Sequence, residues 1–449
     1  MTEEATSFFP QQRCFNRRIK LARFSDKLLL SGYHARRSAM YSFIEDLNMS
    51  LRRMNARRKK SAWLIIGILA VATTLRAPFT SLAPLLGMIQ DDFQLTASQA
   101  GILQTLPLLA FAIFSPFAAG IARKWGMERV IFAALMVVGA GILIRSFCGL
   151  TGLYLGTLLV GMGIALGNVL LPGILKRDLP HRAASLTGFY ALTMGLSAAL
   201  GSATVVPIAH TSSLGWELAS ALTLLYPLVA GLVWLPQISR LSVIDSAMKN
   251  GSAQVRSGGL WGSVLAWQVS LFFGLNSLVY YIIVAWLPAI LQNAGFSTAE
   301  AGSLHGLLQL ATAVPGFFIG FLLSRMRDQR LITVVLSLLG FIGLVGLIVS
   351  PGLAMLWVIL LGISTGAGII LGLTFISLRS GNPAQAASLS GMAQCIGYLL
   401  AAGGPPVAGM LHDFYGSWRP ALMGCAILVL ILTVFGYLAG RARQITPAS

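Results

Sequence analysis

The sequence predicts an all-α membrane protein with twelve transmembrane helices in two six-helix, pseudo-symmetric halves. Three observations support this fold class: an apolar composition, an internal repeat, and basic residues confined to alternate loops. Of the 449 residues, 56% are hydrophobic and only 10% are charged, whereas about a quarter of the residues in a soluble globular protein are charged. This composition excludes a soluble multidomain protein.

The internal repeat divides the chain into two halves. Residues 183–188 have the sequence AASLTG, and residues 386–391, which lie 203 positions later, have the sequence AASLSG. Three further residues recur at nearly the same offset, where Gly161, Arg177 and Gly201 are matched by Gly362, Arg379 and Gly404. This offset is far longer than a solenoid period. Two parallel copies of a membrane-embedded half predict a central junction, which is where transporters built from repeats place their solute.

Twelve windows of about 20 mostly apolar residues are each long enough to cross a hydrocarbon core about 30 Å thick. Each should be helical, because a spanning segment has to satisfy its own backbone hydrogen bonds. Ten or eleven spans remain alternatives, since Pro107, Pro116 or the short connector 350–352 could mislead the assignment. The expected spans begin at Ala62, Ser98, Arg129, Gly152, Ala183, Gly215, Val264, Ala299, Leu331, Leu353, Ala386 and Ser417. The resulting domains are a basic tail (1–60), a first half (61–236), a linker (237–262), a second half (263–440) and a C-terminus (441–449).

Basic residues indicate the orientation of these spans. The chain has 32 Lys and Arg and a net charge of +18, and 14 of the basic residues lie in residues 1–60. The opposite loops contain Arg145 and Arg419 together with acidic residues. By the positive-inside rule both termini are cytoplasmic, which also requires an even number of spans. The remaining basic residues fall in alternate loops and the C-terminus: Arg123, Lys124, Arg129, Lys176, Arg177, Arg182, Arg240, Lys249, Arg256, Arg325, Arg327, Arg330, Arg379, Arg441 and Arg443.

The polar segments carry no sign of a second activity. The basic tail is expected to be disordered, with contact to anionic lipid or a regulatory role as the alternative, and Met49 or Met54 could be the translation start. The linker is too short for a nucleotide-binding domain, and the chain has no phosphate-binding loop. Four cysteines, Cys14, Cys148, Cys395 and Cys425, lack metal-ligand or redox spacing. We expect no metal, no cofactor and no nucleic-acid partner.

The first span contains a charge that needs an explanation. Arg76 lies about 14 residues into it, roughly 21 Å along a helix and close to the midplane, where an Arg costs about 2.5–3.5 kcal/mol to insert. All acidic residues fall in the tail, loops or span ends, so no carboxylate is available inside a span. The remaining partners are water, backbone carbonyls, tyrosine hydroxyls or a solute that carries negative charge. Solute binding is the favoured interpretation, with structural anchoring as the alternative.

Other polar residues at similar depth could complete a solute site. Thr73 and Thr80 share the face of Arg76 at i−3 and i+4 of one helix. Three pairs of polar residues in spans 7, 8 and 11 have i, i+4 spacing: Asn276 with Tyr280, His305 with Gln309, and Gln394 with Tyr398. This spacing places both members of a pair on one helical face. His305 is also the candidate for proton coupling. Each residue could instead make an ordinary interhelical hydrogen bond. The remaining candidates are Asn168, Asn276, Tyr280, His305, Gln309, Gln394 and Tyr398.

Two helix-packing features are expected in the later spans. Glycines at close-packing spacing, such as Gly362 and Gly366, let membrane helices approach each other. The sequence Gly403-Gly404-Pro405-Pro406 predicts a bend in span 11, because proline lacks the donor that the helical hydrogen-bond ladder requires.

Short motifs in the chain resemble the major facilitator superfamily. The sequence RKWGMER at 123–129 is a remnant of the motif between spans 2 and 3 of that family, with Arg123 in the place of its aspartate. The resemblance implies an inner-gate loop formed by Arg123, Lys124, Gly126 and Arg129. Four further motifs resemble the branch of CynX and NimT, the cyanate and 2-nitroimidazole transporters, and lie nearer NimT: TTLR (73–76), LGNVLLP (166–172), NSLVYY (276–281) and GSLHGLLQ (302–309). The resemblance covers residues 60–440 and implies a bacterial inner-membrane carrier of small planar solutes.

The favoured function is therefore secondary active transport of a small anionic or planar solute by rocking of the two halves in a monomer. A membrane-embedded enzyme that acts on lipid is an alternative, although Asp91 and Asp92 with His305 are its only candidate constellation. A transporter of an unrelated drug-like solute is a second alternative. A sensor would require a signalling domain, which the tails and linker are too short to provide.

Overall fold

A computed structural model describes residues 61–179, 182–238, 258–324, 326, 328–381 and 383–445. All that follows concerns the compact unit Leu64–Ser449. The tail 1–60, with Met49 and Met54, and residues 239–257 of the predicted linker lie outside the described residues.

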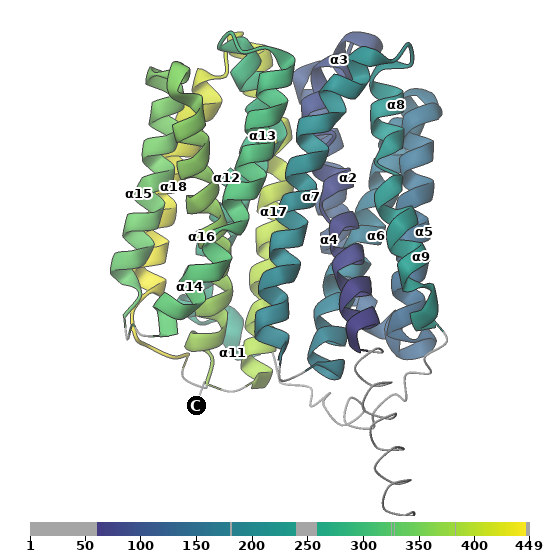
Figure 1. The fold of residues 1–449 in the computed structure, drawn as a ribbon. Helices are drawn as coiled ribbons and strands as arrows, with labels where there is room; N and C mark the ends of the chain where they lie inside the picture. Colours follow the sequence, from purple (N-terminus) through teal and green to yellow (C-terminus); the bar gives the residue numbers. More distant parts are fainter. Residues whose placement is uncertain are drawn as a thin grey trace, which may run out of the picture. The chain divides into compact units, whose positions relative to one another are not determined.

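The helices of the first half run back and forth (Figure 1), and their order along the chain groups them into six passes among the described residues. The first pass is helical over 64–74 and continues through three short helices. The sixth pass is divided between α8 and α9. The elements are α2 (Ala77–Thr80), η1 (Ala83–Leu85), α3 (Leu86–Phe93), α4 (Ala97–Trp125), α5 (Met127–Phe147), α6 (Gly149–Asp178), α7 (Ala183–Thr211), α8 (Gly215–Leu222) and α9 (Leu225–Ile238).

The second half repeats this order. A short helix precedes it, its second pass is divided between α13 and α14, and its fourth pass begins with one 3-10 turn. The elements are α11 (Gly258–Trp261), α12 (Val264–Asn293), α13 (Thr298–Ala313), α14 (Pro315–Ser324), α15 (Arg330–Val349), η3 (Pro351–Leu353), α16 (Ala354–Arg379), α17 (Pro383–Tyr415) and α18 (Arg419–Ala439).

The predicted fold class is confirmed, and the predicted spans agree closely with the helices. Each predicted start lies within three residues of an observed helix start. Among the described residues, eleven helices are long and apolar enough to cross a membrane. The position of the predicted eleventh span is occupied by α17, a single helix of 33 residues.

Local sequence explains where the helices begin and turn. Thr96 and Gln99 form a capping box at the start of α4, and Ser297 and Glu300 form one at the start of α13. In each box the two side chains accept hydrogen bonds from each other's backbone N–H groups, which the helix leaves free. Gly126 alone joins α4 to α5. Its φ of 88° lies in the region that favours glycine, so a tight connection is possible there.

The repeated glycines make equivalent contacts in the two halves. Gly161 of α6 lies against Pro107 of α4, and its counterpart Gly362 of α16 lies against Leu308 of α13. A Cβ atom added at Gly362 would lie 2.9 Å from the carbonyl oxygen of Leu308. These are fourth-pass to second-pass contacts in both halves, which supports the pseudo-symmetry inferred from the repeat.

The first span differs from the continuous helix that the sequence predicted. The helix over 64–74 ends in a turn at 75–76, and a second turn at 81–82 separates α2 from η1. Pro78 lies in the first turn of α2, where its missing N–H is tolerated. Because the turn at 75–76 interrupts the helix, the i−3 argument that placed Thr73 on the face of Arg76 does not apply. Thr80 keeps its i+4 relation to Arg76, since its backbone N–H donates to the Arg76 carbonyl at 3.0 Å.

The two ends of the helices differ in charge. We call the end with Arg123, Lys124, Arg177 and Arg379 the basic end. The end with Asp91, Asp92, Glu217, Glu300 and Asp413 is called the acidic end. The halves meet mainly through α4 against α17 and α7 against α13.

Candidate functional site

Arg76 lies at the break of the first span and reaches from the first half into the second. It occupies the N-cap position of α2, with φ −134° and ψ −46°. Its guanidinium Nη2 donates to the hydroxyl of Tyr280 on α12 and to Thr312 Oγ1 on α13 at 3.1 Å. The guanidinium also lies 5.5 Å from the centre of the Tyr280 ring. Arg76 therefore connects the two halves through neutral partners.

A hydrogen-bonded chain continues from Tyr280 into the second half. The Tyr280 hydroxyl donates to Gln309 Oε1 at 3.2 Å, and Gln309 Nε2 lies 3.3 Å from His305 Nε2. Both Gln309 and His305 are fully buried. The i, i+4 spacing of these residues placed them on one face of α13, and the structure brings that face to Tyr280. This hydrogen-bonded series contains no carboxylate, so the groups that it places beside His305, Gln309 and Tyr280, are neutral.

The Tyr280 ring lies beside Arg76, and further ring pairs lie on the other helices of this region. Tyr281 meets Phe79 edge to face at 6.0 Å, and Tyr398 meets Phe111 in the same way at 5.7 Å. Ring faces and edges of this kind bind flat, polarisable solutes.

Two more predicted residues reach this aromatic set. The Tyr190 hydroxyl donates to Asn168 Oδ1 at 3.3 Å, which connects α7 with α6. Tyr398 of α17 contributes its ring from the second half. The structure thus brings together Arg76, Asn168, Tyr280, His305, Gln309 and Tyr398 of the predicted set.

The other predicted residues are engaged elsewhere. The hydroxyls of Thr73 and Thr80 bond to backbone carbonyls of their own segment, at Ala70 (2.7 Å) and Arg76 (3.1 Å). Asn276 donates to the carbonyl of Thr365 on α16 at 3.1 Å. Gln394 donates to Ser390 of its own helix at 2.8 Å. In this structure the four side chains therefore bond within their own segment or to a neighbouring helix.

Three residues of the site were absent from the sequence prediction. Thr312 follows Gln309 by three positions and His305 by seven, so the same helical face would have included it. Tyr190 and Tyr281 have no such spacing signal. They belong to the site through contacts between helices, which sequence alone does not show: Tyr190 of α7 bonds to Asn168 of α6, and the Tyr281 ring of α12 meets the Phe79 ring of α2.

Arg145 was expected in a loop, and the structure corrects this. It lies in the last turn of α5 and is 1% exposed. The sequence assignment placed it outside the membrane because a charge stood at the end of an apolar window.

The predicted gating loop has a different charged group at its centre. Arg123, Lys124 and Arg129 are exposed. Glu128 is only 3% exposed and forms an ion pair of 2.6 Å with Arg177 at the end of α6. Arg177 also pairs with Asp178 at 2.7 Å. The hydrogen bond to Asp178 raises the pKa of the Arg177 guanidinium against the opposing effect of burial.

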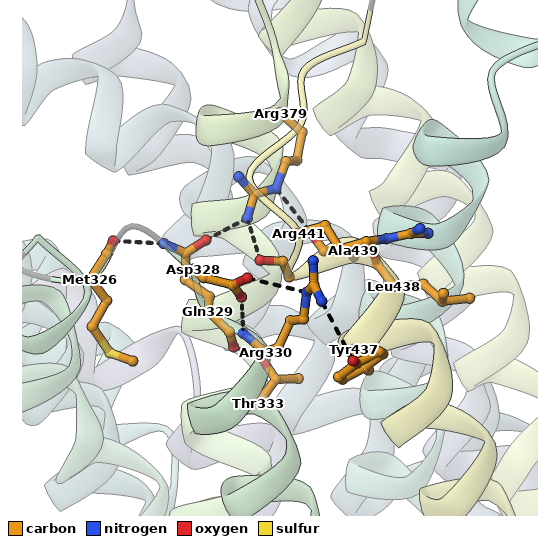
Figure 2. Close-up of polar contacts among 11 residues, drawn as sticks. Met326, Asp328, Gln329, Arg330, Thr333, Arg379, Tyr437, Leu438, Ala439 and Arg441 are labelled. Carbon is orange, nitrogen blue, oxygen red and sulfur yellow. Dashed lines mark hydrogen bonds and ion pairs between the residues drawn. The ribbon is translucent and has the colours of Figure 1, made fainter.

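The second half repeats this arrangement without the ion pair. Figure 2 shows Arg379, the repeat counterpart of Arg177, directed toward Gln329 and the chain that follows α18. Arg379 donates to the carbonyls of Ala439 at 2.8 Å and Gly440 at 3.1 Å. Nearby, Arg330 pairs with Asp328 at 3.2 Å. Both halves therefore fasten the basic end of the fourth pass to the start of the third.

The acidic end is closed by contacts between the halves. Asp413 of α17 accepts from the backbone N–H groups of Ala97 (3.0 Å) and Ser98 (2.9 Å) at the start of α4. About two turns further along α4, Thr105 donates to the carbonyl of Ala402 at 2.6 Å. That carbonyl needs an external donor, because Pro406 has no N–H to offer it. The helix α17 passes through both prolines without interruption.

The structure does not assemble the constellation of a lipid enzyme. Asp92 accepts from the indole N–H of Trp216 at 3.1 Å, while His305 bonds to Gln309. Among the described residues no cluster of His, Cys, Asp or Glu could hold a metal ion.

Two pseudo-symmetric helical halves with a polar site at their junction define a carrier of the alternating-access class. Residues 63–402 match the Major Facilitator Superfamily, and the chain belongs to this family. It is a multi-pass membrane protein and a secondary transporter of small solutes.

Individual relatives agree with this assignment. The chain is 54% identical to the 2-nitroimidazole transporter of Escherichia coli strain K12 over 85% of its own length and 96% of that protein. It is 26% identical to the cyanate transport protein CynX of the same organism, over 79% of this chain and 91% of that one. Among solved structures, a bacterial homologue of the human lysosomal transporter Spinster has a TM-score of 0.70 at 16% identity, covering 86% of this chain and 99% of the other.

Proposed function

We propose that this carrier moves a small planar solute with an anionic or strongly accepting edge, and that Arg76 binds that edge between the two halves. The observation that carries the proposal is the position of Arg76 at the junction with neutral partners only. Both of its hydrogen bonds among the described residues come from Nη2. The Nε and Nη1 groups, which point to different sides of the guanidinium, are therefore left to donate to acceptor atoms of a solute.

The solute class follows from the groups beside the guanidinium. A nitro group has oxygens that can accept a hydrogen bond from the guanidinium, and its ring can lie against the tyrosine and phenylalanine rings of the site. The likeness to the 2-nitroimidazole transporter supports a nitroimidazole-like solute. Cyanate, suggested by the likeness to CynX, would use the positive charge but not the rings.

The orientation is part of the same proposal. The basic end faces the cytoplasm of a bacterial cell with the protein in the inner membrane, and both termini are cytoplasmic. The closed acidic end then faces outward, so the described state is closed to the outside. The proposed direction of net transport is efflux. His305 is retained as the proposed site of proton coupling.

Binding and counterflow test the proposal directly. Purified wild-type protein in liposomes should exchange 2-nitroimidazole, and Arg76→Ala should weaken binding about 10- to 100-fold, as expected for loss of a hydrogen bond to a charged group. Arg76→Lys should be intermediate, because it keeps the charge and loses the planar fork. Arg419→Ala, which removes an exposed Arg at the start of α18, is the matched control. Unchanged exchange by Arg76→Ala would reject the proposed role.

A further inference from the structure

The break in the first span leaves a carbonyl that needs a donor. In a continuous helix the N–H of Leu82 would bond to the carbonyl of Pro78. Here the Leu82 N–H instead points to the carbonyl of Phe79, at 3.4 Å. Pro78 is buried, and a buried carbonyl without a partner is costly. Some other group has to supply the missing hydrogen bond.

Arg145 supplies it. Its Nη1 donates to the carbonyl oxygen of Pro78 at 2.8 Å. Its Nε donates to Ser220 Oγ at 3.0 Å and its Nη2 to Thr223 Oγ1 at 3.2 Å. Ser220 and Thr223 lie where α8 ends and the sixth span is interrupted. One guanidinium therefore joins the interruption of the first span to that of the sixth.

The turn that Arg145 holds is the turn that presents Arg76. The N–H groups of Phe79 and Thr80 both donate to the carbonyl of Arg76, at 3.2 and 3.0 Å. Pro78 lies inside this turn, two residues after Arg76. A shift of the Pro78 carbonyl would therefore move the backbone from which the Arg76 side chain crosses to Tyr280 and Thr312.

A buried Arg with neutral partners is expensive for stability alone. Burial of an uncompensated charge costs several kcal/mol, and an apolar residue of similar size often gives a more stable protein. We propose that Arg145 is a positioning residue of the solute site, which holds the Pro78 carbonyl and so sets where Arg76 enters the space between the halves. This inference rests on the proposed function of Arg76.

A double-mutant cycle separates positioning from general stabilisation. Solute affinity is measured with 2-nitroimidazole for wild type, Arg145→Met, Arg76→Ala and the double variant. Arg145→Met should weaken binding about tenfold in the wild-type background, and less than about twofold when Arg76 is already alanine, because residues in one network are not additive. Arg145→Lys, which can donate to Pro78 but not to three groups in a fixed plane, should recover part of the loss.

Two further variants complete the design. Arg379→Met removes another buried Arg with neutral partners, far from the site at the basic end, and should leave solute affinity unchanged. Thr223→Val removes one acceptor of Arg145 with little change in volume, and it carries the same cycle if Arg145→Met does not fold, with a smaller loss expected. Equal losses in both Arg76 backgrounds would overturn the positioning role. Unchanged binding by Arg76→Ala alone would instead overturn the proposed function.

Discussion

At the scale of single residues, Tyr280 has the central position. Its hydroxyl accepts from Arg76 in the first half and donates to Gln309 in the second, while its ring lies beside the guanidinium. Its neighbour Tyr281 contributes a ring to the same site, 5.0 Å from that of Tyr280. A comparison of the two tyrosines can therefore separate what the Tyr280 hydroxyl contributes to the site from what an aromatic ring contributes.

We predict that Tyr280→Phe weakens both stability and solute binding. The change keeps the ring, leaves Gln309 Oε1 without its donor and leaves Arg76 Nη2 with Thr312 as its one partner among the described residues. A buried group left unsatisfied costs about 1–3 kcal/mol. Thermal unfolding with and without 2-nitroimidazole measures both effects. Tyr281→Phe is the matched control and should bind as wild type does. Equal behaviour of the two variants would contradict the central role of the Tyr280 hydroxyl.

The sequence predicted part of this site because helical spacing carries information about faces. His305 and Gln309 were paired correctly by their i, i+4 spacing, and Arg76 was singled out by the cost of a charge in an apolar span. Thr80 lies at i+4 from Arg76 within α2, as its spacing predicted, whereas the turn at 75–76 removes the helical basis for placing Thr73 on that face. Contacts between helices distant in sequence, such as those of Tyr190, depend on how the halves pack, and spacing within one helix does not contain that information.

At the scale of elements, the closest approach between the halves involves α4 and α17. A Cβ atom added at Gly101 would lie 2.7 Å from the carbonyl oxygen of Pro405 and 2.9 Å from Pro406 Cα. Both contacts are with backbone, which cannot rotate away. On the same helix, Gly120 has nothing within 4 Å of an added Cβ atom.

Gly101→Ala should therefore push α4 away from α17 and favour opening of the acidic end. Spin labels at Leu214→Cys and Phe414→Cys, two exposed positions at that end, would report a longer distance in a cysteine-free background. Overpacking of this kind typically costs about 1–3 kcal/mol, enough to shift the population of the two states measurably. Gly120→Ala should leave the distances as in the parent protein. A Gly101→Ala distribution equal to the parent's would mean that the interface adapts without opening.

At the scale of the whole molecule, the charged residues and the internal repeat together show how each end of the helices is held. The two halves use the same fastening at the basic end, with Glu128 and Arg177 in one and Gln329 and Arg379 in the other. At the acidic end a carboxylate of one half, Asp413, caps a helix of the other. The fastenings at the basic end lie within each half, whereas the cap at the acidic end joins the two, so the cap has to break when the halves part there.

Cys148 provides a test of the proposed orientation. It is exposed and lies between α5 and α6 at the acidic end. A membrane-impermeant maleimide added to intact spheroplasts should label it, because the acidic end is proposed to face outward. Cys148→Ser should remove that labelling and leaves Cys395 and Cys425 as internal controls. Labelling of Cys148 only after the cells are opened would reverse the orientation.

The carbonyl of Ala402 gives the outer closure a further property. While the acidic end is shut, this oxygen receives the Thr105 hydroxyl of the opposite half. When the halves move apart it still requires a donor, and a solvent molecule entering from the aqueous side can replace the hydroxyl. In each transport cycle the Ala402 carbonyl would then gain a bound water and lose it again. The rate at which the acidic end closes would depend on how readily that water leaves.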